Sequence, residues 1–177
     1  MSQMIDYPLE RLRASARRTP AFDPFPLLEA LHRHGAVAVV IGQVAGIMHG
    51  SIEPTGDLDL LWDGSPAHAP ALAAALASVG ARLADERGGP LAMRPESLLR
   101  PKVQFTSPGA VGDCCTPALP WGNLSVRECL DRAITTVDPG GLAVRYVSRE
   151  DLILMRRALG RPKDLRRADE LDAAAGS

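Results

Sequence analysis

The chain has 177 residues, of which 46% are hydrophobic and 4% aromatic, and a formal net charge of −1 from 20 basic and 21 acidic side chains. This length and composition predict one domain with a core filled mainly by Ala, Leu and Val. The near-neutral charge argues against a uniformly basic surface for nucleic acid, and the few aromatic residues argue against a stacking surface for single strands.

Several absences narrow the class of protein further. Residues 1–18 have no apolar segment of the signal-peptide kind, and no apolar run approaches the roughly 20 residues of a membrane span. The cysteines Cys114, Cys115 and Cys129 are odd in number and lack CxxC spacing. We therefore expect buried thiols rather than disulfides or a zinc site, and a cytoplasmic protein without a membrane anchor.

The first elements along the chain are expected to be helical. Residues 1–23 are polar and rich in arginine, which indicates an arm or a helix. Pro24 and Pro26 then introduce a helical segment at 27–34, and Gly35 is placed to end it.

The next elements alternate between strand and helix. Residues 36–41, AVAVVI, form a short apolar run that predicts a buried strand. Gly42 ends this strand, and residues 43–50 predict a short helix. After a loop at 51–56, DLDLLW at 57–62 predicts a second strand. Alternation of this kind is typical of an α/β or α+β layered fold with a mixed sheet.

The second half of the chain continues this alternation. An Ala-rich helix is expected at 70–80, and residues 81–122 hold short strand candidates interrupted by Gly and Pro, namely RLA, PLAMR, KVQFTS and VGDCCT. The remaining elements are expected to be a helix at 126–134, a strand at 143–147, and helices at 149–159 and 163–175. Gly160 and Pro162 separate the last two helices.

Asp57 and Asp59 are the residues most indicative of chemistry. At positions i and i+2 of a strand their side chains share one face, roughly 6.5 Å apart along the chain. Two such carboxylates repel each other unless a cation lies between them. Mg²⁺ prefers oxygen ligands and is often held by one or two carboxylates plus substrate phosphates. The alternative is a solvated strand face, whereas a calcium loop is excluded because Leu61 and Trp62 occupy positions where that loop needs an oxygen ligand and a glycine.

Two stretches of the sequence resemble a known family. VIGQVAGIMHGSIEPTGDLDLLW resembles the signature of the nucleotidyltransferase superfamily, in which a hydrophobic strand, a Gly pair and a short helix precede Thr-x-Asp-x-Asp. VSREDLILMRRALGRPKDLRRADEL is similar to the C-terminal signature of the small bacterial branch that includes the AbiE-type toxin nucleotidyltransferases. Together the two stretches cover about a quarter of the chain.

The resemblance implies a fold and an activity. The fold is a polymerase-β-like palm at 24–147, a mixed sheet with flanking helices, followed by a helical segment at 148–177 packed on it. The activity is transfer of a nucleoside monophosphate from an NTP such as ATP to an acceptor hydroxyl, with release of pyrophosphate and with Mg²⁺ or Mn²⁺ as the metal. The acceptor is left open among a tRNA, a protein and a small molecule, and an antitoxin protein is a candidate partner.

The resemblance also assigns residues around the aspartates. Gly42 and Gln43 match the Gly pair that seats phosphates, and Thr55 matches the threonine before the metal-binding Asp57 and Asp59. Asp113 is the candidate for the third carboxylate, as a metal ligand or general base.

Three positions depart from the family pattern or leave its assignment open. Gln43 stands where Gly or Ser is usual, and Arg156 stands where Lys is usual. A gapless comparison can place Gly112 rather than Asp113 at the third carboxylate. These departures leave open a second hypothesis, a degenerate palm that binds a nucleotide or a partner without catalysis.

The C-terminal basic motif is expected to form part of the same site. Arg161 and Lys163 lie on the corner between the last two helices, where we expect them to face the aspartates across a cleft and to neutralise triphosphate or acceptor charge. Asp164 is expected in the first turn of the final helix. Arg166 and Arg167 should matter little if they lie on the solvent side.

Overall fold

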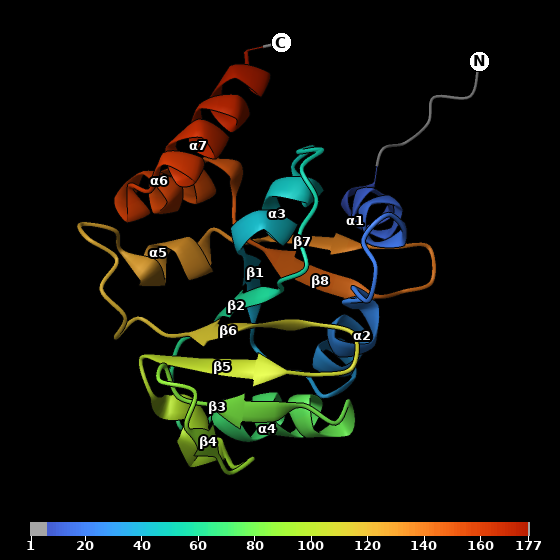
Figure 1. The fold of residues 1–177 in the computed structure, drawn as a ribbon, viewed down its shortest axis with the longest axis vertical. Coiled ribbons are helices and arrows are strands. Elements are labelled where there is room, and N and C mark those ends of the chain that lie inside the picture. The colour runs from blue at the N-terminus through green and yellow to red at the C-terminus, as the bar shows by residue number, and fades with distance from the viewer. Residues whose placement is uncertain (1–6, 177) are drawn as a thin grey trace.

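The computed structural model describes residues 7–176 and confirms an α/β fold with one mixed sheet and flanking helices (Figure 1). In this part of the chain the strands are β1 (Val39–Ile41), β2 (Asp59–Leu61), β3 (Arg82–Ala84), β4 (Pro90–Leu91), β5 (Lys102–Thr106), β6 (Val111–Cys115), β7 (Ile134–Val137) and β8 (Ala143–Tyr146). They form one sheet in the order β4-β3-β5-β6-β2-β1-β8-β7.

The helices lie between and after these strands. They are α1 (Pro8–Arg17), α2 (Phe25–Arg33), α3 (Gly42–Met48), α4 (Ala69–Ser78), the 3₁₀ helix η1 (Pro95–Leu99), α5 (Val126–Asp131), α6 (Arg149–Leu159) and α7 (Pro162–Ala174). Helices α6 and α7 lie beside α3, far from the β3–β4 end of the sheet (Figure 1). No helix in the described range is long and apolar enough to cross a lipid bilayer.

The centre of the sheet combines parallel and antiparallel pairing. Strand β1 runs antiparallel to β2 and parallel to β8, and β2 runs parallel to β6. The β2–β6 register pairs Leu60 with Cys114, so the residues before them, Asp59 and Asp113, lie side by side. Leu58, Leu60 and Trp62 alternate with the aspartates and are fully buried on one face of this segment, so Asp57 and Asp59 point to the other face.

Two glycines and a proline determine how the backbone bends around the site. Gly42 follows β1 with φ +66°, a left-handed conformation that favours glycine. Gly160 ends α6 at φ +68°, and Pro162 is the first residue of α7, so the chain turns sharply between the two helices as expected. Asp164 lies in the first turn of α7, as expected.

The structure can be compared with the expected elements segment by segment. The helix expected at 126–134 ends at Asp131, and Ile134–Val137 is a strand, β7, that was not expected. The strand expected at 57–62 is shorter, because Asp57 makes only an isolated bridge to Val111. Within the arm or helix expected at 1–23, helix α1 forms, while residues 1–6 lie outside the described residues.

The core is aliphatic, as the composition predicts. Trp62 and Phe105 are the largest of its fully buried side chains, and leucine, valine and alanine fill most of the rest. The three cysteines are free and buried, as expected.

Candidate functional site

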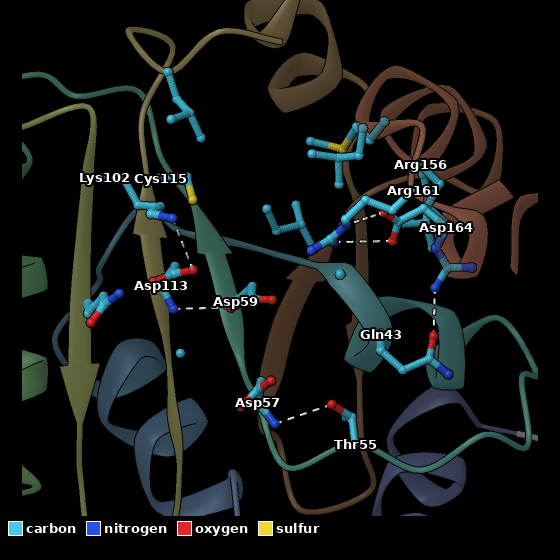
Figure 2. Close-up of a pocket in the computed structure, with 18 of the residues that line it drawn as sticks. Gln43, Thr55, Asp57, Asp59, Lys102, Asp113, Cys115, Arg156, Arg161 and Asp164 are labelled. Atoms are coloured by element: carbon cyan, nitrogen blue, oxygen red, sulfur yellow. Dashed lines mark hydrogen bonds and ion pairs between the residues drawn. The ribbon is translucent and has the colours of Figure 1, made fainter. Parts of the chain in front are cut away.

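A cavity of about 550 Å³ lies between the central strands and the C-terminal helices. One wall is formed by the end of β1, the start of α3 and strands β2, β5 and β6, and the other by α6, α7 and the loop before α5. The residues that the sequence singled out all line it, namely Gly42, Gln43, Thr55, Asp57, Asp59, Asp113, Arg161 and Lys163. The structure therefore brings both halves of the sequence pattern to one place (Figure 2).

The three acidic side chains lie on neighbouring strand positions of the same cavity wall. Asp59 is the first residue of β2, and its Oδ1 accepts a hydrogen bond of 3.1 Å from the backbone N–H of Asp113 on β6. Asp57 lies two residues before Asp59, and its own N–H donates to the Thr55 hydroxyl at 3.2 Å.

The strand register decides between Asp113 and Gly112 as the neighbour of these aspartates. Asp113 is adjacent to Asp59, whereas Gly112 lies against the backbone of Leu58. A Cβ on Gly112 would stand 1.8 Å from the Leu58 carbonyl oxygen, so no side chain fits there. Asp113, and not Gly112, therefore places a carboxylate beside Asp59 at the cavity wall.

Burial in the cavity wall raises the pKa of two carboxyl groups, those of Asp59 and Asp113. Burial, followed by the negative charges of Asp113 and Asp57, raises the pKa of Asp59 to about 6, although the hydrogen bond from the Asp113 backbone opposes this. The pKa of Asp113 is also raised, mainly by burial, while the Lys102 ammonium, 3.9 Å from its Oδ2, opposes the rise. The positive charge near this wall is therefore not enough to offset the cost of ionising these two carboxyl groups.

We expect replacement of Asp59 with Asn to stabilise the metal-free protein above pH 6. The folded-state pKa of about 6 lies above the value near 4 of an unfolded chain, so ionisation of Asp59 destabilises the fold as pH rises through 4–6. Removing that ionisation should add roughly 2–3 kcal/mol to the free energy of unfolding. Urea denaturation of the wild type and the variant in EDTA, at pH 7.5 and at pH 4, measures this gain in the free energy of unfolding. A gain of equal size at both pH values would contradict the electrostatic cause.

The donor set suits a hard divalent cation. Its oxygens are carboxylates, and Gly42 leaves open the space next to Asp59, where a Cβ would come within 2.8 Å of Oδ2. Within residues 7–176 no group of three or more His, Cys, Asp or Glu side chains is arranged to hold a metal ion. A cation here would therefore take two protein carboxylates and complete its oxygen shell from phosphates and water, an arrangement common for Mg²⁺.

The C-terminal corner supplies positive charge on the opposite wall. Arg161 precedes α7 and projects into the cavity toward the strands, with its guanidinium paired to the buried Asp164 (Figure 2). Lys163, in the first turn of α7, is exposed and also lines the cavity. Both cationic residues of the corner thus line the same cavity as the aspartates.

Arg167 does not meet the condition of lying on the solvent side, whereas Arg166 does. The Arg167 side chain is only 17% exposed, and its guanidinium pairs with both carboxylate oxygens of Glu53, at 2.6 and 3.0 Å. This pair lowers the pKa of Glu53 to about 2. The α7 periodicity alone could not reveal it, because Glu53 comes from a loop more than a hundred residues earlier.

Other cavity residues were not singled out as contributors from the sequence. Lys102 reaches the carboxylates from β5, and an apolar wall is built by Leu119, Pro120, Trp121, Leu152 and Met155. These residues reach the cavity because of the sheet register and the packing of α6. No local pattern in the sequence predicts the register or the packing.

The fold and the cavity define an α/β protein with a carboxylate wall facing a cationic corner. A comparison with protein-family models gave no match, and neither did a comparison with curated proteins. The residues of the cavity therefore carry the functional proposal.

Proposed function

We propose that this chain is a metal-dependent nucleotidyltransferase that moves a nucleoside monophosphate from an NTP to an acceptor hydroxyl. The observation that carries the proposal is the convergence of Asp57, Asp59 and Asp113 with the Arg161–Lys163 corner in one cavity. Carboxylates suit a cation and the corner suits phosphates, so the two walls together suit a metal–triphosphate. The resemblance of both stretches to the nucleotidyltransferase superfamily supports the same function.

The chain's own residues have separate roles in this mechanism. Asp57 and Asp59 would hold Mg²⁺ or Mn²⁺, which when bound polarises phosphoryl oxygens and offsets their charge. Asp113 accepts the proton of the acceptor hydroxyl, and its raised pKa makes it a stronger base than an ordinary carboxylate. The acceptor oxygen forms a bond to the α-phosphorus while the bond to pyrophosphate breaks. Arg161 and Lys163 bind the leaving phosphates.

Replacement of Asp113 with Ala should lower the transfer rate by at least ~10²-fold, the lower range for a general base. The expected change is in the rate at saturating NTP, because Asp113 acts on the acceptor proton. Transfer from α-labelled NTP, followed over time, measures it. A near-normal rate would assign the proton to another group.

Lys102 favours a second candidate function, a palm that binds a nucleotide or a partner without catalysis. Its ammonium lies 3.9 Å from Asp113, so the protein itself supplies a cation at the carboxylates. Incubation of the purified protein with each α-labelled NTP, with Mg²⁺, Mn²⁺ or EDTA, separates the two functions. Metal-dependent label in a product supports transfer, whereas binding without product supports the second candidate.

The acceptor can be found by the same chemistry. Cell extract divided into tRNA, protein and small-molecule fractions provides the three acceptor classes. Label that enters one fraction in the presence of the wild-type chain, and not with the Asp59→Asn variant, identifies the class. The antitoxin partner that the resemblance implies is tested by adding candidate proteins to the same assay and measuring inhibition.

A further inference from the structure

Gln43 is buried, and both polar ends of its amide make contacts within the protein. Its Nε2 donates to the Ser51 hydroxyl at 3.0 Å and to the Glu53 carbonyl at 2.8 Å, and its Oε1 accepts from Arg156 Nη2 at 2.7 Å. Gln43 lines the cavity, but these contacts direct its amide to the loop before β2 and to α6 rather than to a ligand.

Arg156 is the unusual partner in this arrangement. It is 4% exposed, and its guanidinium donates to two neutral oxygens, Gln43 Oε1 and the Arg167 carbonyl. In the part of the chain that the structure describes, no ion pair joins Arg156 to a carboxylate. Burial, together with the positive charge of Arg167, lowers the pKa of Arg156 to about 10. A buried cation of this kind is costly unless something offsets its charge.

The fold leaves room for this contact at Gly46. A Cβ at Gly46 would stand 2.6 Å from Arg156 Nη2 and 2.9 Å from Gln43 Oε1. Glycine inside a helix costs about 1 kcal/mol relative to alanine. Glycine at position 46 is therefore explained by sterics, because a side chain there would block the contact between Arg156 and Gln43.

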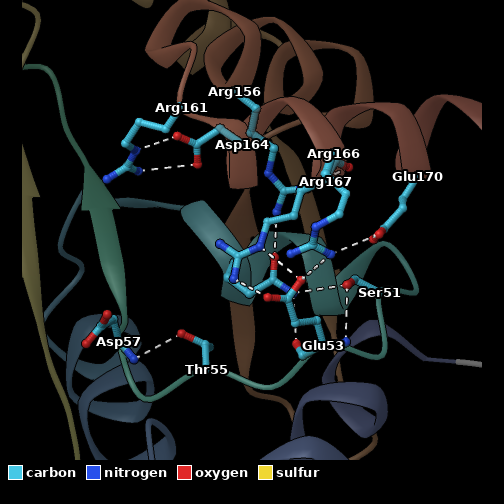
Figure 3. A network of polar contacts seen from close by, with 11 residues as sticks. Ser51, Glu53, Thr55, Asp57, Arg156, Arg161, Asp164, Arg166, Arg167 and Glu170 are labelled. Atoms are coloured by element: carbon cyan, nitrogen blue, oxygen red, sulfur yellow. Dashed lines mark hydrogen bonds and ion pairs between the residues drawn. The ribbon is translucent and has the colours of Figure 1, made fainter.

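The contact is one side of a closed ring of four residues. Arg156 donates to the Arg167 carbonyl, Arg167 pairs with the Glu53 carboxylate, and the Glu53 carbonyl accepts from Gln43 (Figure 3). The ring joins α6 and α7 to α3 and to the loop that leads into Asp57. It therefore holds the guanidinium of Arg156 against α3 and α7, and Arg156 is one of the residues that line the cavity.

The charges of the other cavity arginines are already matched. Arg161 pairs with Asp164, and Arg167 pairs with Glu53. Arg156 instead contacts a neutral amide, where a glutamate of nearly the same size would bring a negative charge. The neutral side chain at position 43 therefore adds no negative charge beside Arg156.

We propose that Gln43 is a positioning residue that holds Arg156 at the cavity wall without neutralising it, so that an inorganic or nucleotide polyphosphate binds there. The nucleotide form of this ligand rests on the proposed function, whereas the polyphosphate chemistry does not. Gln43 acts through Arg156 and does not itself contact the phosphates.

The test compares Gln43→Glu, which keeps an acceptor for Arg156 but adds a negative charge, with the nearly isosteric and neutral Gln43→Met. Binding of inorganic tripolyphosphate, and separately of ATP, is measured by calorimetry without any acceptor. Gln43→Glu should weaken tripolyphosphate binding at least about tenfold, in line with loss of a charge-assisted hydrogen bond. It should also reduce the dependence of the dissociation constant on salt, which a merely structural role would leave unchanged. Gln43→Met should weaken binding less and keep that salt dependence.

A matched pair of arginine variants provides the control. Arg156→Gln should lose tripolyphosphate binding as strongly as Gln43→Glu does. Arg157→Gln makes the same change one residue further along α6, where the guanidinium pairs with Asp172 away from the cavity, and should bind as the wild type does. Thermal unfolding of each variant shows whether the fold is kept, and the arginine pair decides the question if Gln43→Glu does not fold.

Three results would overturn the proposal. They are absence of tripolyphosphate binding by the wild type, unchanged binding by Gln43→Glu, and equal losses in Arg156→Gln and Arg157→Gln. Failure of the proposed function has a different outcome, which is a wild-type protein that binds tripolyphosphate through Arg156 but transfers no label from any NTP.

Discussion

Replacement of either Asp57 or Asp59 with Asn is expected to abolish nucleotidyl transfer. Both carboxylates face the cavity, and the amide that replaces either one cannot offset the charge of a divalent cation. The change keeps size and shape, and the carbonyl oxygen of an amide at position 59 can still accept the hydrogen bond that the Asp113 N–H donates to Asp59. Loss of activity would therefore report the charge. Transfer of α-labelled NTP in Mg²⁺ and in Mn²⁺ measures the effect.

Asp131→Asn is the control for this experiment, because Asp131 is an exposed residue at the end of α5 and does not line the cavity. It should transfer at the wild-type rate. Unfolding of all three variants should remain cooperative, since none removes a buried apolar contact. Wild-type transfer by an Asp57→Asn, Asp59→Asn double variant would refute the assignment of the carboxylates.

The second large effect is expected at Gly112, whose replacement with Ala should destabilise the fold by at least about 3 kcal/mol, in the range of severe steric mutations. The added Cβ would stand 1.8 Å from the Leu58 carbonyl oxygen and 2.6 Å from the Leu58 carbonyl carbon. Backbone atoms cannot move aside as a flexible side chain can, so β6 must shift away from β2. That shift separates Asp113 from Asp59 as well. Urea denaturation followed by circular dichroism measures the loss of stability.

Gly56→Ala is the matched control, one residue before Asp57. A Cβ there meets nothing within 4 Å, and the backbone of Gly56 is not in the left-handed region. Its stability should change by less than about 0.5 kcal/mol, as at open surface positions. An equal loss of stability in Gly112→Ala and Gly56→Ala would mean that the close approach of Gly112 to Leu58 is not the reason why a side chain is excluded at position 112.

The sequence predicted the fold class and the order of most elements because apolar periodicity and glycine or proline stops are local signals. It missed β7, since Ile134 follows the apolar spacing of the helix before it. That segment becomes a strand because it pairs with β8, joining Thr135 to Arg145 and Thr136 to Val144. Strand pairing is a tertiary interaction, and it can override the local preference of a segment for helix.

In the candidate site, too, local features could be predicted from the sequence and tertiary contacts could not. The shared direction of Asp57 and Asp59 follows from a spacing of two residues, and the corner at Arg161 follows from Gly160 and Pro162. The choice between Gly112 and Asp113 needed the β2–β6 register, and the burial of Arg167 needed the position of Glu53. Contacts between residues this far apart leave no trace in one sequence.

The parallel pairing of β2 with β6 also has a consequence for how the protein folds. The two strands are joined by a long stretch of chain that includes α4, β3 and β5, so a long loop must close before Asp59 meets Asp113. Closing it loses chain entropy before any contact compensates, and parallel pairing of distant strands is intrinsically slow. The antiparallel β1–β2 and β5–β6 pairs, which are closer in sequence, can form earlier. The carboxylate wall is therefore expected to be among the last parts of the molecule to assemble, and recovery of metal-dependent binding during refolding should lag behind recovery of secondary structure.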